Sequence, residues 1–284
     1  MESFSIVIIS YNGKNLLREC LKLIPKSEIL PEKTVVVDDF SDDGTSNMVK
    51  TEFPSVKLIT NKKNFGPTFS RNRGAEIVDS EYVVFLDNDV LVRPGTFKKL
   101  IDFIKNNPDA GVVGTKIQPE GKEKIWWNMG YEPNNFREAA GYFYGFLLKI
   151  FSHSKWLKNR AVKFILNYSD YKETVPVGWV IESCFIIEKK LFDKIGGFDE
   201  RFFMFFEGPD LCFRVKKEGF KVYFYPDAAV DSLSGHTHSK LKRAVVFNRS
   251  KYLFYKKHYF YKKSNPVFYW AGKIASGIAY LIAK

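Results

Sequence analysis

Two aspartates that stand one residue apart follow an apolar stretch of this chain. Residues 82–86 have the continuous apolar pattern of a buried strand, and Asp87 and Asp89 come directly after it. Side chains two residues apart on a strand point to the same side, so the two carboxylates can converge where open α/β sheets bind ligands. Paired carboxylates there suit a hard divalent cation, and such a cation suits a diphosphate. The alternative for an isolated Asp-x-Asp is turn chemistry or a helix cap.

A second pair of carboxylates follows another predicted strand. Residues 35–37 are three valines, and Asp38 and Asp39 come after them, so these side chains should face the same crevice. Carboxylates in this position commonly accept hydrogen bonds from ribose hydroxyls or base N–H groups. The alternative is capping of the following helix, a role that fits Ser41 and Asp42 better.

A glycine turn before a predicted helix adds a candidate anion site. Asn64 and Gly66 precede a proline that can open the helix, and a helix N-terminus attracts anions. Arg71 lies one turn into that helix, where its guanidinium could bind a diphosphate with two hydrogen bonds. The alternative is a surface ion pair between Arg71 and Glu76 or Asp79.

Alternating strands and helices must position these groups. The apolar periodicity predicts strands at 4–9, 35–37, 56–60 and 82–86, and helices at 16–24, 67–78 and 94–106, with another helix starting after the turn at 41–45. This alternation predicts an α/β fold, a mainly parallel sheet flanked by helices. After Gly111 the strand-like pieces (112–117, 183–188 and 222–225) are spread among loops and helices. Neither Gly-x-Gly-x-x-Gly nor a P-loop motif is present, which disfavours dinucleotide dehydrogenases and P-loop NTPases.

Composition indicates a globular chain with a large core. The 284 residues are 45% hydrophobic and 17% aromatic, which suffices for one large domain or two small ones. The three cysteines are widely spaced and form neither a zinc pattern nor a disulfide framework. The N-terminus enters a strand at once, without the features of a signal peptide. We therefore expect the protein to act in the cytoplasm.

Positive charge is concentrated at the C-terminal end. The net charge is +12, yet 11 of the 44 Lys and Arg residues, and none of the 32 Asp and Glu residues, follow Asp231. The last 19 residues, 266–284, are largely apolar, and we expect either an interfacial amphipathic helix or a terminal helix packed on the core. Lysines interleaved with aromatic residues over 232–284 suit an anionic membrane surface. No nucleic-acid-binding module is visible, so we do not expect a nucleic acid partner.

Residues 194–214 decide between classes of protein. They run Lys-Ile-Gly-Gly-Phe-Asp-Glu-Arg-Phe-Phe-Met-Phe-Phe-Glu-Gly-Pro-Asp-Leu-Cys-Phe-Arg. Together with the motifs at 8–12, 37–45, 64–66, 71–74 and 87–89, this segment resembles the family 2 glycosyltransferases, in particular their rhamnosyltransferase-like branch. The resemblance covers residues 4 to about 235 with the motifs in the expected order, and it implies the GT-A fold.

The resemblance also implies an activity and a set of site residues. Family members transfer a sugar from a nucleotide diphosphate sugar to an acceptor hydroxyl, with inversion at the anomeric carbon. By similarity, Asp89 would hold Mg²⁺ or Mn²⁺, Asp87 would bind the ribose or share the metal, and His236 could be a further metal ligand. The residues expected to bind the nucleotide sugar are Tyr11, Asn12, Asp38, Asp39, Asn64, Gly66, Arg71, Asp87 and Trp179. Trp179 and Glu182 fall where related enzymes contact the transferred sugar or the acceptor.

One position departs from the family pattern. The family usually has Glu-Asp-x-Asp, whose second residue is the usual base, but this chain has Glu207, Gly208, Pro209 and Asp210. We expect Glu207 to take the proton of the acceptor hydroxyl, because the flexible Gly208 permits a modest backbone shift. Asp210 could instead fill that role or cap a helix beginning at Leu211, and loss of activity is a third possibility.

These observations predict a GT-A glycosyltransferase domain at 1–231, with a nucleotide-sugar half at 1–115 and an acceptor half at 116–231. Residues 232–284 form a basic, aromatic extension. We expect a metal-dependent inverting transferase that acts on a lipid-linked glycan or a cell-surface polysaccharide precursor, bound peripherally to the inner face of the cell membrane. The alternatives are a catalytically impaired sugar-nucleotide-binding protein and a sugar-nucleotide nucleotidyltransferase.

Overall fold

A mixed β-sheet runs through the centre of the molecule. The computed structural model describes residues 3–119, 128–133, 172–233 and 240–259. The main sheet has the order β3 (Lys57–Thr60), β2 (Lys33–Asp38), β1 (Phe4–Ser10), β4 (Tyr82–Asp87), β10 (Cys184–Glu188), β6 (Ala110–Pro119), β11 (Lys221–Ser232) and β5 (Val90–Val92), with β8 (Val175–Pro176) paired to β11. The strands β3, β2, β1 and β4 are parallel, and β6 is parallel to β11. Every antiparallel pair within this described sheet involves β10, β5 or β8: β10 pairs with β4 and β6, and β5 and β8 pair with β11.

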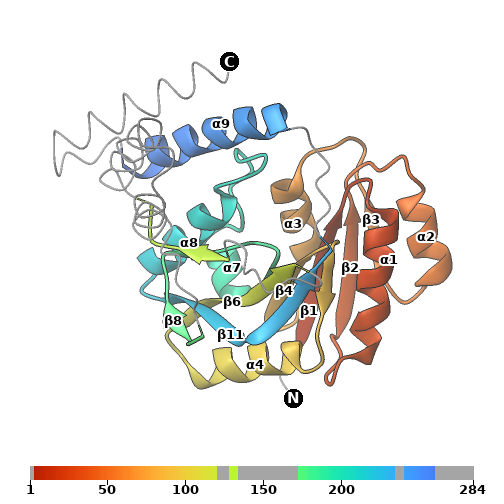
Figure 1. Cartoon of the computed structure of the whole chain (residues 1–284), viewed down its shortest axis with the longest axis horizontal. Helices are drawn as coiled ribbons and strands as arrows, with labels where there is room; N and C mark the ends of the chain where they lie inside the picture. The colour runs from red at the N-terminus through yellow and green to blue at the C-terminus, as the bar shows by residue number, and fades with distance from the viewer. Residues whose placement is uncertain (1–2, 120–127, 134–171, 234–239, 260–284) are drawn as a thin grey trace, which may run out of the picture.

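Helices cover both faces of the sheet, as Figure 1 shows. One face packs against α1 (Lys14–Leu23), α2 (Thr45–Glu52) and α4 (Thr96–Asn106), and the other against α3 (Pro67–Ala75), α7 (Lys189–Lys194) and α8 (Glu207–Lys217). Side chains alternate along β1, so Ile6 and Ile8 enter the first core while Val7 enters the second. Because the first four strands are parallel and flanked on both faces, their carboxyl ends open at one edge of the sheet.

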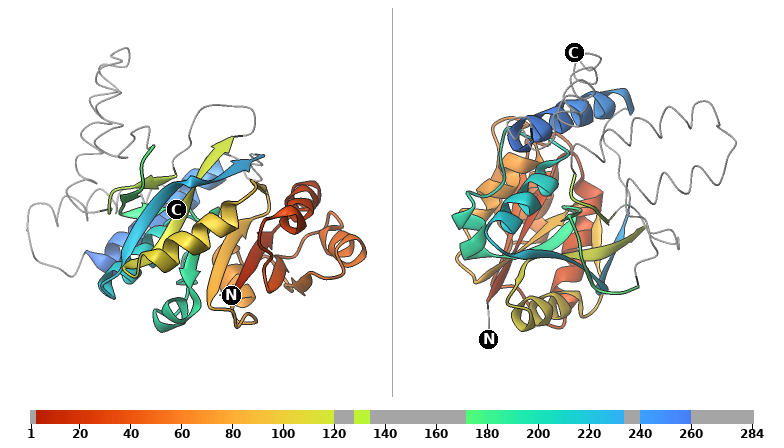
Figure 2. Two further views of the ribbon diagram at one scale, coloured as in Figure 1. Left: turned by 90° about the horizontal axis from the view of Figure 1, so that it is seen from below. Right: turned by 90° about the vertical axis from the view of Figure 1, so that its left-hand side faces the viewer.

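The helix α9 (Lys240–His258) lies on the α8 side of the molecule, opposite α4, in both Figure 1 and Figure 2. A separate aromatic core joins it to the domain. Phe254 is buried against Phe213 of α8, with ring centroids 6.2 Å apart, and Phe202 and Tyr255 complete the cluster. The Ser250 hydroxyl also donates to the backbone oxygen of Met204 at 2.7 Å. Part of the basic extension is therefore packed on the rest of the domain.

The predicted elements are confirmed, with differences at their ends. The helix predicted at 67–78 stops at Ala75, and the strand predicted at 222–225 extends to Ser232. The short strand β5 and the pair formed by β7 (Met129–Gly130) and β9 (Trp179–Val180) were not predicted, because two or three residues carry no periodicity. A η1 turn (Ile24–Lys26) follows α1.

One correction bears on the site. The helix expected to begin at Leu211 begins four residues earlier, at Glu207, after Phe206 in the left-handed conformation. Pro209 is tolerated in this first turn, since its missing N–H has no partner to lose there. Asp210 is therefore inside α8 and is not its N-cap.

The expected terminal helix at 266–284 and the acid-free stretch at 139–169 lie outside the described residues, and the domain boundary at 231 stays a prediction. Within the part of the chain that is described, no helix is both long and apolar enough to cross a bilayer.

Candidate active site

The turn after β4 carries the first pair of carboxylates. Asp87 is the last residue of β4, while Asn88 and Asp89 form the turn to β5, so the alternation rule for strands does not apply to Asp89. The Asn88 amide donates to the hydroxyl of Ser10 at 2.9 Å, which fastens the turn to the end of β1. The Ser232 hydroxyl lies 3.4 Å from Oδ2 of Asp89, on the β11 side. The turn is thus held from two directions with both carboxylates partly exposed.

Arg71 connects this turn to the start of α8. It is only 3% exposed, and its Nη2 donates to Oδ1 of Asp87 at 2.8 Å while Nη1 lies 3.4 Å from Oε1 of Glu207. Burial alone would lower the pKa of Arg71, but Asp87 and Glu207 outweigh it and raise that pKa. The surface ion pairs considered for Arg71 are not what the structure shows, because α3 turns this side chain into the protein. Arg71, Asp87 and Glu207 therefore form one ionic cluster.

Asp39 organises the loop that leads into α3. One of its oxygens accepts the Asn61 amide at 2.7 Å and the backbone N–H of Phe65 at 3.0 Å, and the other accepts the N–H of Gly66 at 2.8 Å. Asn64 adds a bond to the same N–H at 3.1 Å. Gly66 has φ +91°, and an added Cβ would lie 2.8 Å from a backbone oxygen, so no other residue fits without a shift. The loop is fixed by hydrogen bonds before any ligand arrives.

Asp38 and Asn12 join two neighbouring loops. Oδ1 of Asp38 accepts the backbone N–H of Ser41 at 3.0 Å, and Asn12 exchanges bonds with the same loop through Ser41 and Asp42 at 2.9 Å each. Asn12 has a positive φ of 50°, and the adjacent Tyr11 is partly exposed. The predicted nucleotide residues thus lie in loops that follow the adjacent strands β1 and β2.

Glu207 and Glu182 lie together at the first turn of α8. Glu207 is 4% exposed, and within the described residues its buried Oε2 has no hydrogen-bond partner. Oε1 of Glu182 accepts the backbone N–H of Gly208 at 2.6 Å. Burial, and then the Glu207 carboxylate, raise the pKa of Glu182 to about 8. Burial raises the pKa of Glu207 as well, although Arg71 opposes it.

Asp210 faces away from this cluster, toward α9. It is fully buried and contacts the Nε of Arg214 at 2.8 Å, the Nζ of Lys257 at 2.6 Å and the Nε2 of His258 at 2.7 Å. Burial would raise its pKa, but the bond from His258 and the charge of Arg214 outweigh burial and lower it. The geometry gives Asp210 a part in attaching α9.

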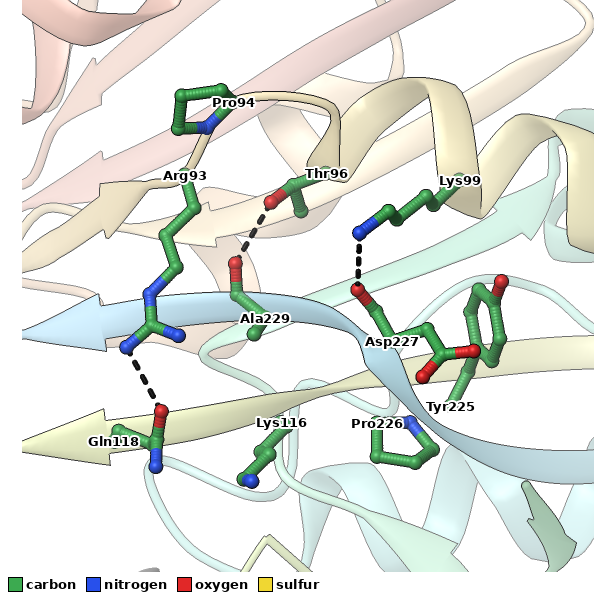
Figure 3. A pocket seen from close by; sticks show the side chains of 10 residues that line it. All are labelled: Arg93, Pro94, Thr96, Lys99, Lys116, Gln118, Tyr225, Pro226, Asp227 and Ala229. Carbon is green, nitrogen blue, oxygen red and sulfur yellow. Dashed lines mark hydrogen bonds between the residues drawn. The ribbon is translucent and has the colours of Figure 1, made fainter. Parts of the chain in front are cut away.

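A separate pocket of about 450 Å³ lies on the α4 side of the sheet, and Figure 3 shows its lining. It is formed by the turn before α4 and by β6 and β11, and none of the predicted site residues lines it. At its edge the Nε of Arg93 donates to Oδ2 of Asp231 at 2.8 Å. Asp231 is thus held by an arginine.

Two predicted residues remain apart from these contacts. Trp179 is partly buried in β9 with its indole over Gly130, where an added Cβ would meet Nε1 at 2.6 Å. His236 lies outside the described residues.

The carboxylates at the β4 turn fit a cation that a substrate helps to bind. Among the described side chains, no group of three or more His, Cys, Asp or Glu could hold a metal alone. Mg²⁺ commonly uses one or two carboxylates together with substrate phosphates and water. Arg71 faces the acidic side chains of Asp87, Glu207 and Glu182, and burial raises the pKa values of both glutamates. A divalent cation bound by Asp87 and Asp89 would favour the ionised forms of these neighbouring acids.

The fold and the site together define a GT-A glycosyltransferase. A family model described as glycosyl transferase family 2 matches residues 5–165, and the chain belongs to this family.

Two relatives extend the similarity. The chain is 26% identical over 264 residues, 88% of its length and 82% of the relative, to N-acetylglucosaminyl-diphospho-decaprenol L-rhamnosyltransferase of Mycobacterium tuberculosis (strain ATCC 25618 / H37Rv). It is 29% identical over 174 residues, 58% of its length and 53% of the relative, to poly(ribitol-phosphate) beta-N-acetylglucosaminyltransferase TarP of Staphylococcus aureus (strain N315).

Solved structures confirm the fold. The mannosyltransferase PcManGT from Pyrobaculum calidifontis, in complex with GDP-Man and Mn²⁺, has a TM-score of 0.60 at 15% identity and covers 99% of this chain and 72% of its own. TarS from S. aureus has a TM-score of 0.60 at 17% identity, and the match covers 90% of this chain but only 39% of TarS.

Sequence reasoning missed several groups that shape the site. Asn61 follows the end of β3, and the strand-end rule that found Asp38 could have found it. Glu182 was expected near the sugar or the acceptor, but its bond to α8 was not expected. Lys257 and His258 were counted only as part of a basic tail, because nothing local to α9 indicates a partner in α8.

Proposed function

We propose that this protein is a metal-dependent inverting glycosyltransferase that uses a nucleotide diphosphate sugar. The observation that supports it most is the cluster of Arg71, Asp87 and Glu207. This cluster brings together the end of β4, helix α3 and the start of α8. Transfer requires these three regions, because the diphosphate, the sugar and the acceptor must meet at one carbon atom.

On the donor side, the loops that follow β1 and β2 bind the nucleotide through Tyr11, Asn12 and Asp39, with Asp38 close by. Arg71 and the start of α3 lie on the diphosphate side, near Asn64 and Gly66. Asp87 and Asp89 hold Mg²⁺ or Mn²⁺, which neutralises charge on the departing diphosphate. The complex of PcManGT with GDP-Man and Mn²⁺ supports this assignment by analogy of fold.

On the acceptor side, a carboxylate near the start of α8 takes the proton of the acceptor hydroxyl. Glu207 and Asp210 are the candidates from the sequence, and Trp179 contributes to the sugar or acceptor side. The name of the mycobacterial relative supports a lipid-linked glycan as acceptor. Such an acceptor favours peripheral binding to the inner face of the membrane through residues 232–284. Lys257 does not contribute to that contact, because it pairs with Asp199 and Asp210.

The test is a thermal-shift screen of UDP-, GDP- and dTDP-sugars, each with and without Mn²⁺. A ligand at 100 times its Kd should stabilise the protein by about 2.7 kcal/mol, which raises the Tm by roughly 5 °C. Asp89→Asn should abolish the Mn²⁺-dependent part of the shift. The matched control Asp102→Asn, on the exposed face of α4, should leave it unchanged. Stabilisation by none of these sugars would contradict the proposal.

A further inference from the structure

The space beside Gly208 is filled by another residue's carboxylate. A Cβ added to Gly208 would lie 1.9 Å from Oε1 of Glu182 and 2.4 Å from its Cδ. Both distances are far shorter than any non-bonded contact, so Glu182 occupies the volume in which a side chain at 208 would begin. An aspartate at position 208, which the family resemblance leads us to expect, would have to place its Cβ in this volume.

Glu182 reaches this position from a different element. It lies between β9 and β10, and its Oε1 accepts the N–H of Gly208 in the first turn of α8 at 2.6 Å. The bond fixes the carboxylate against the helix while Oε2 takes no part in it. Glu182 is intermediate in exposure as a residue, whereas Glu207 and Asp210 are buried.

The other two acids are held differently. The side chain of Glu207 is 5% exposed and lies against the guanidinium of Arg71. Asp210 is fully buried against Arg214 of α8 and against Lys257 and His258 of α9. Asp210 is thus fully engaged by its neighbours, and the Glu207 carboxylate, whose Oε2 has no partner among the described residues, is buried away from solvent.

We propose that Glu182 is the catalytic base of this enzyme. Its carboxylate occupies the space that an aspartate at position 208, where this chain has glycine, would otherwise take. The assignment rests on the proposed transferase function. The acceptor oxygen forms a bond to the anomeric carbon while the bond from that carbon to the diphosphate oxygen breaks. The electron pair leaves with the nucleoside diphosphate, and the hydroxyl proton goes to Glu182. Burial raises the pKa of Glu182 to about 8, so the group titrates near neutral pH and its ionised form is a stronger proton acceptor than an ordinary carboxylate.

Activity of matched variants tests the assignment. The assay measures transfer from the nucleotide sugar found in the thermal screen to an N-acetylglucosaminyl-diphospho-lipid. Glu182→Gln keeps an oxygen for the Gly208 N–H, so we expect a Tm no lower than that of the wild type and an unchanged donor Kd, but a kcat lower by about 100-fold or more. Glu207→Gln, in contrast, should weaken donor binding through its contact with Arg71.

Moving the carboxylate from position 182 to position 208 gives a sharper test. Glu182→Ala combined with Gly208→Asp removes one carboxylate and supplies the other from the helix. The kcat of this double variant should be roughly 10-fold or more above that of Glu182→Ala alone. The control, Glu182→Ala with Gly208→Asn, has the same shape without a base and should recover nothing.

The outcomes separate the two proposals. If the wild type transfers sugar and Glu182→Gln keeps its kcat, Glu182 is not the base, although the proposed function stands. If the wild type transfers no sugar from any donor tested, the proposed function fails and this assignment fails with it. The geometry has its own test: Gly208→Ala should lower the Tm by ~4 °C in the wild type and by much less in Glu182→Ala. Equal losses in both backgrounds would contradict the shared space.

Discussion

Replacing Asp210 should loosen α9 from the body of the enzyme. Its carboxylate is fully buried and contacts Arg214, Lys257 and His258 at 2.6–2.8 Å. Asp210→Asn keeps the shape of the side chain but removes the charge that compensates these groups. Since α8 and α9 also share an aromatic core, the loss should spread along their interface.

The expected cost follows from burial. Removing one partner of a buried ion pair typically costs 3–5 kcal/mol. Arg214 and Lys257 keep 16% and 20% of their side chains exposed, so water can still solvate them in part. We therefore expect a loss of about 3 kcal/mol, which corresponds to a fall in Tm of roughly 6 °C or more for a chain of this length. The matched control is Asp102→Asn, which breaks the exposed pair with Lys98 and should cost less than about 0.5 kcal/mol.

Differential scanning calorimetry measures both variants, and hydrogen exchange over residues 240–258 reports the attachment of α9. The pH dependence has a defined sign. The folded-state pKa values of His258 and Asp210 lie below their ordinary values of 6.5 and 3.8. Both groups stabilise the fold above those values, and stability is lost first as the pH falls below 6.5 and again below 3.8. A wild-type Tm for Asp210→Asn, with unchanged exchange in α9, would refute this account.

Three further predictions address the crevice. Asp87→Asn should weaken Mn²⁺-dependent donor binding by 10-fold or more, because the variant lacks a metal ligand and the partner of Arg71. Isothermal titration calorimetry measures the affinity, and a donor affinity equal to that of the wild type would exclude Asp87 as a metal ligand. Gly66→Ala should lower the Tm by roughly 4 °C in thermal denaturation, because φ +91° and the ring of Phe203 oppose a Cβ, and an unchanged Tm would contradict that crowding. Glu182→Gln in metal-free buffer should stabilise the protein increasingly from pH 5 to pH 8. The reason is that the folded-state pKa of Glu182 is raised to about 8, so the wild-type protein loses stability as the pH rises. A difference in Tm between the two proteins that does not depend on pH would show that this pKa is ordinary.

The sequence by itself determined the sheet, its flanking helices and the donor half of the candidate site. Parallel strands buried on both faces carry continuous apolar runs, and their carboxyl ends are fixed by chain direction alone. Asp38, Asp39 and Asp87 could therefore be assigned to one crevice from their positions after strands. Arg71 was assigned to the same crevice, because a helix that starts at Gly66 and Pro67 directs its first turn toward that edge of the sheet.

Only the tertiary structure decided which acids are free to act. Asp210 looked like a helix cap or a base, but α9 brings Lys257 and His258 against it from 47 and 48 residues away. Glu182 and Gly208 are separated by 26 residues, and no pattern in either segment indicates that one fills the space of the other. Such pairings depend on how helices and loops pack in three dimensions, which hydrophobic periodicity does not encode. Metal binding by Asp87 and Asp89 stays a prediction. The structure makes Glu182, in place of Glu207 and Asp210, our candidate for the catalytic base.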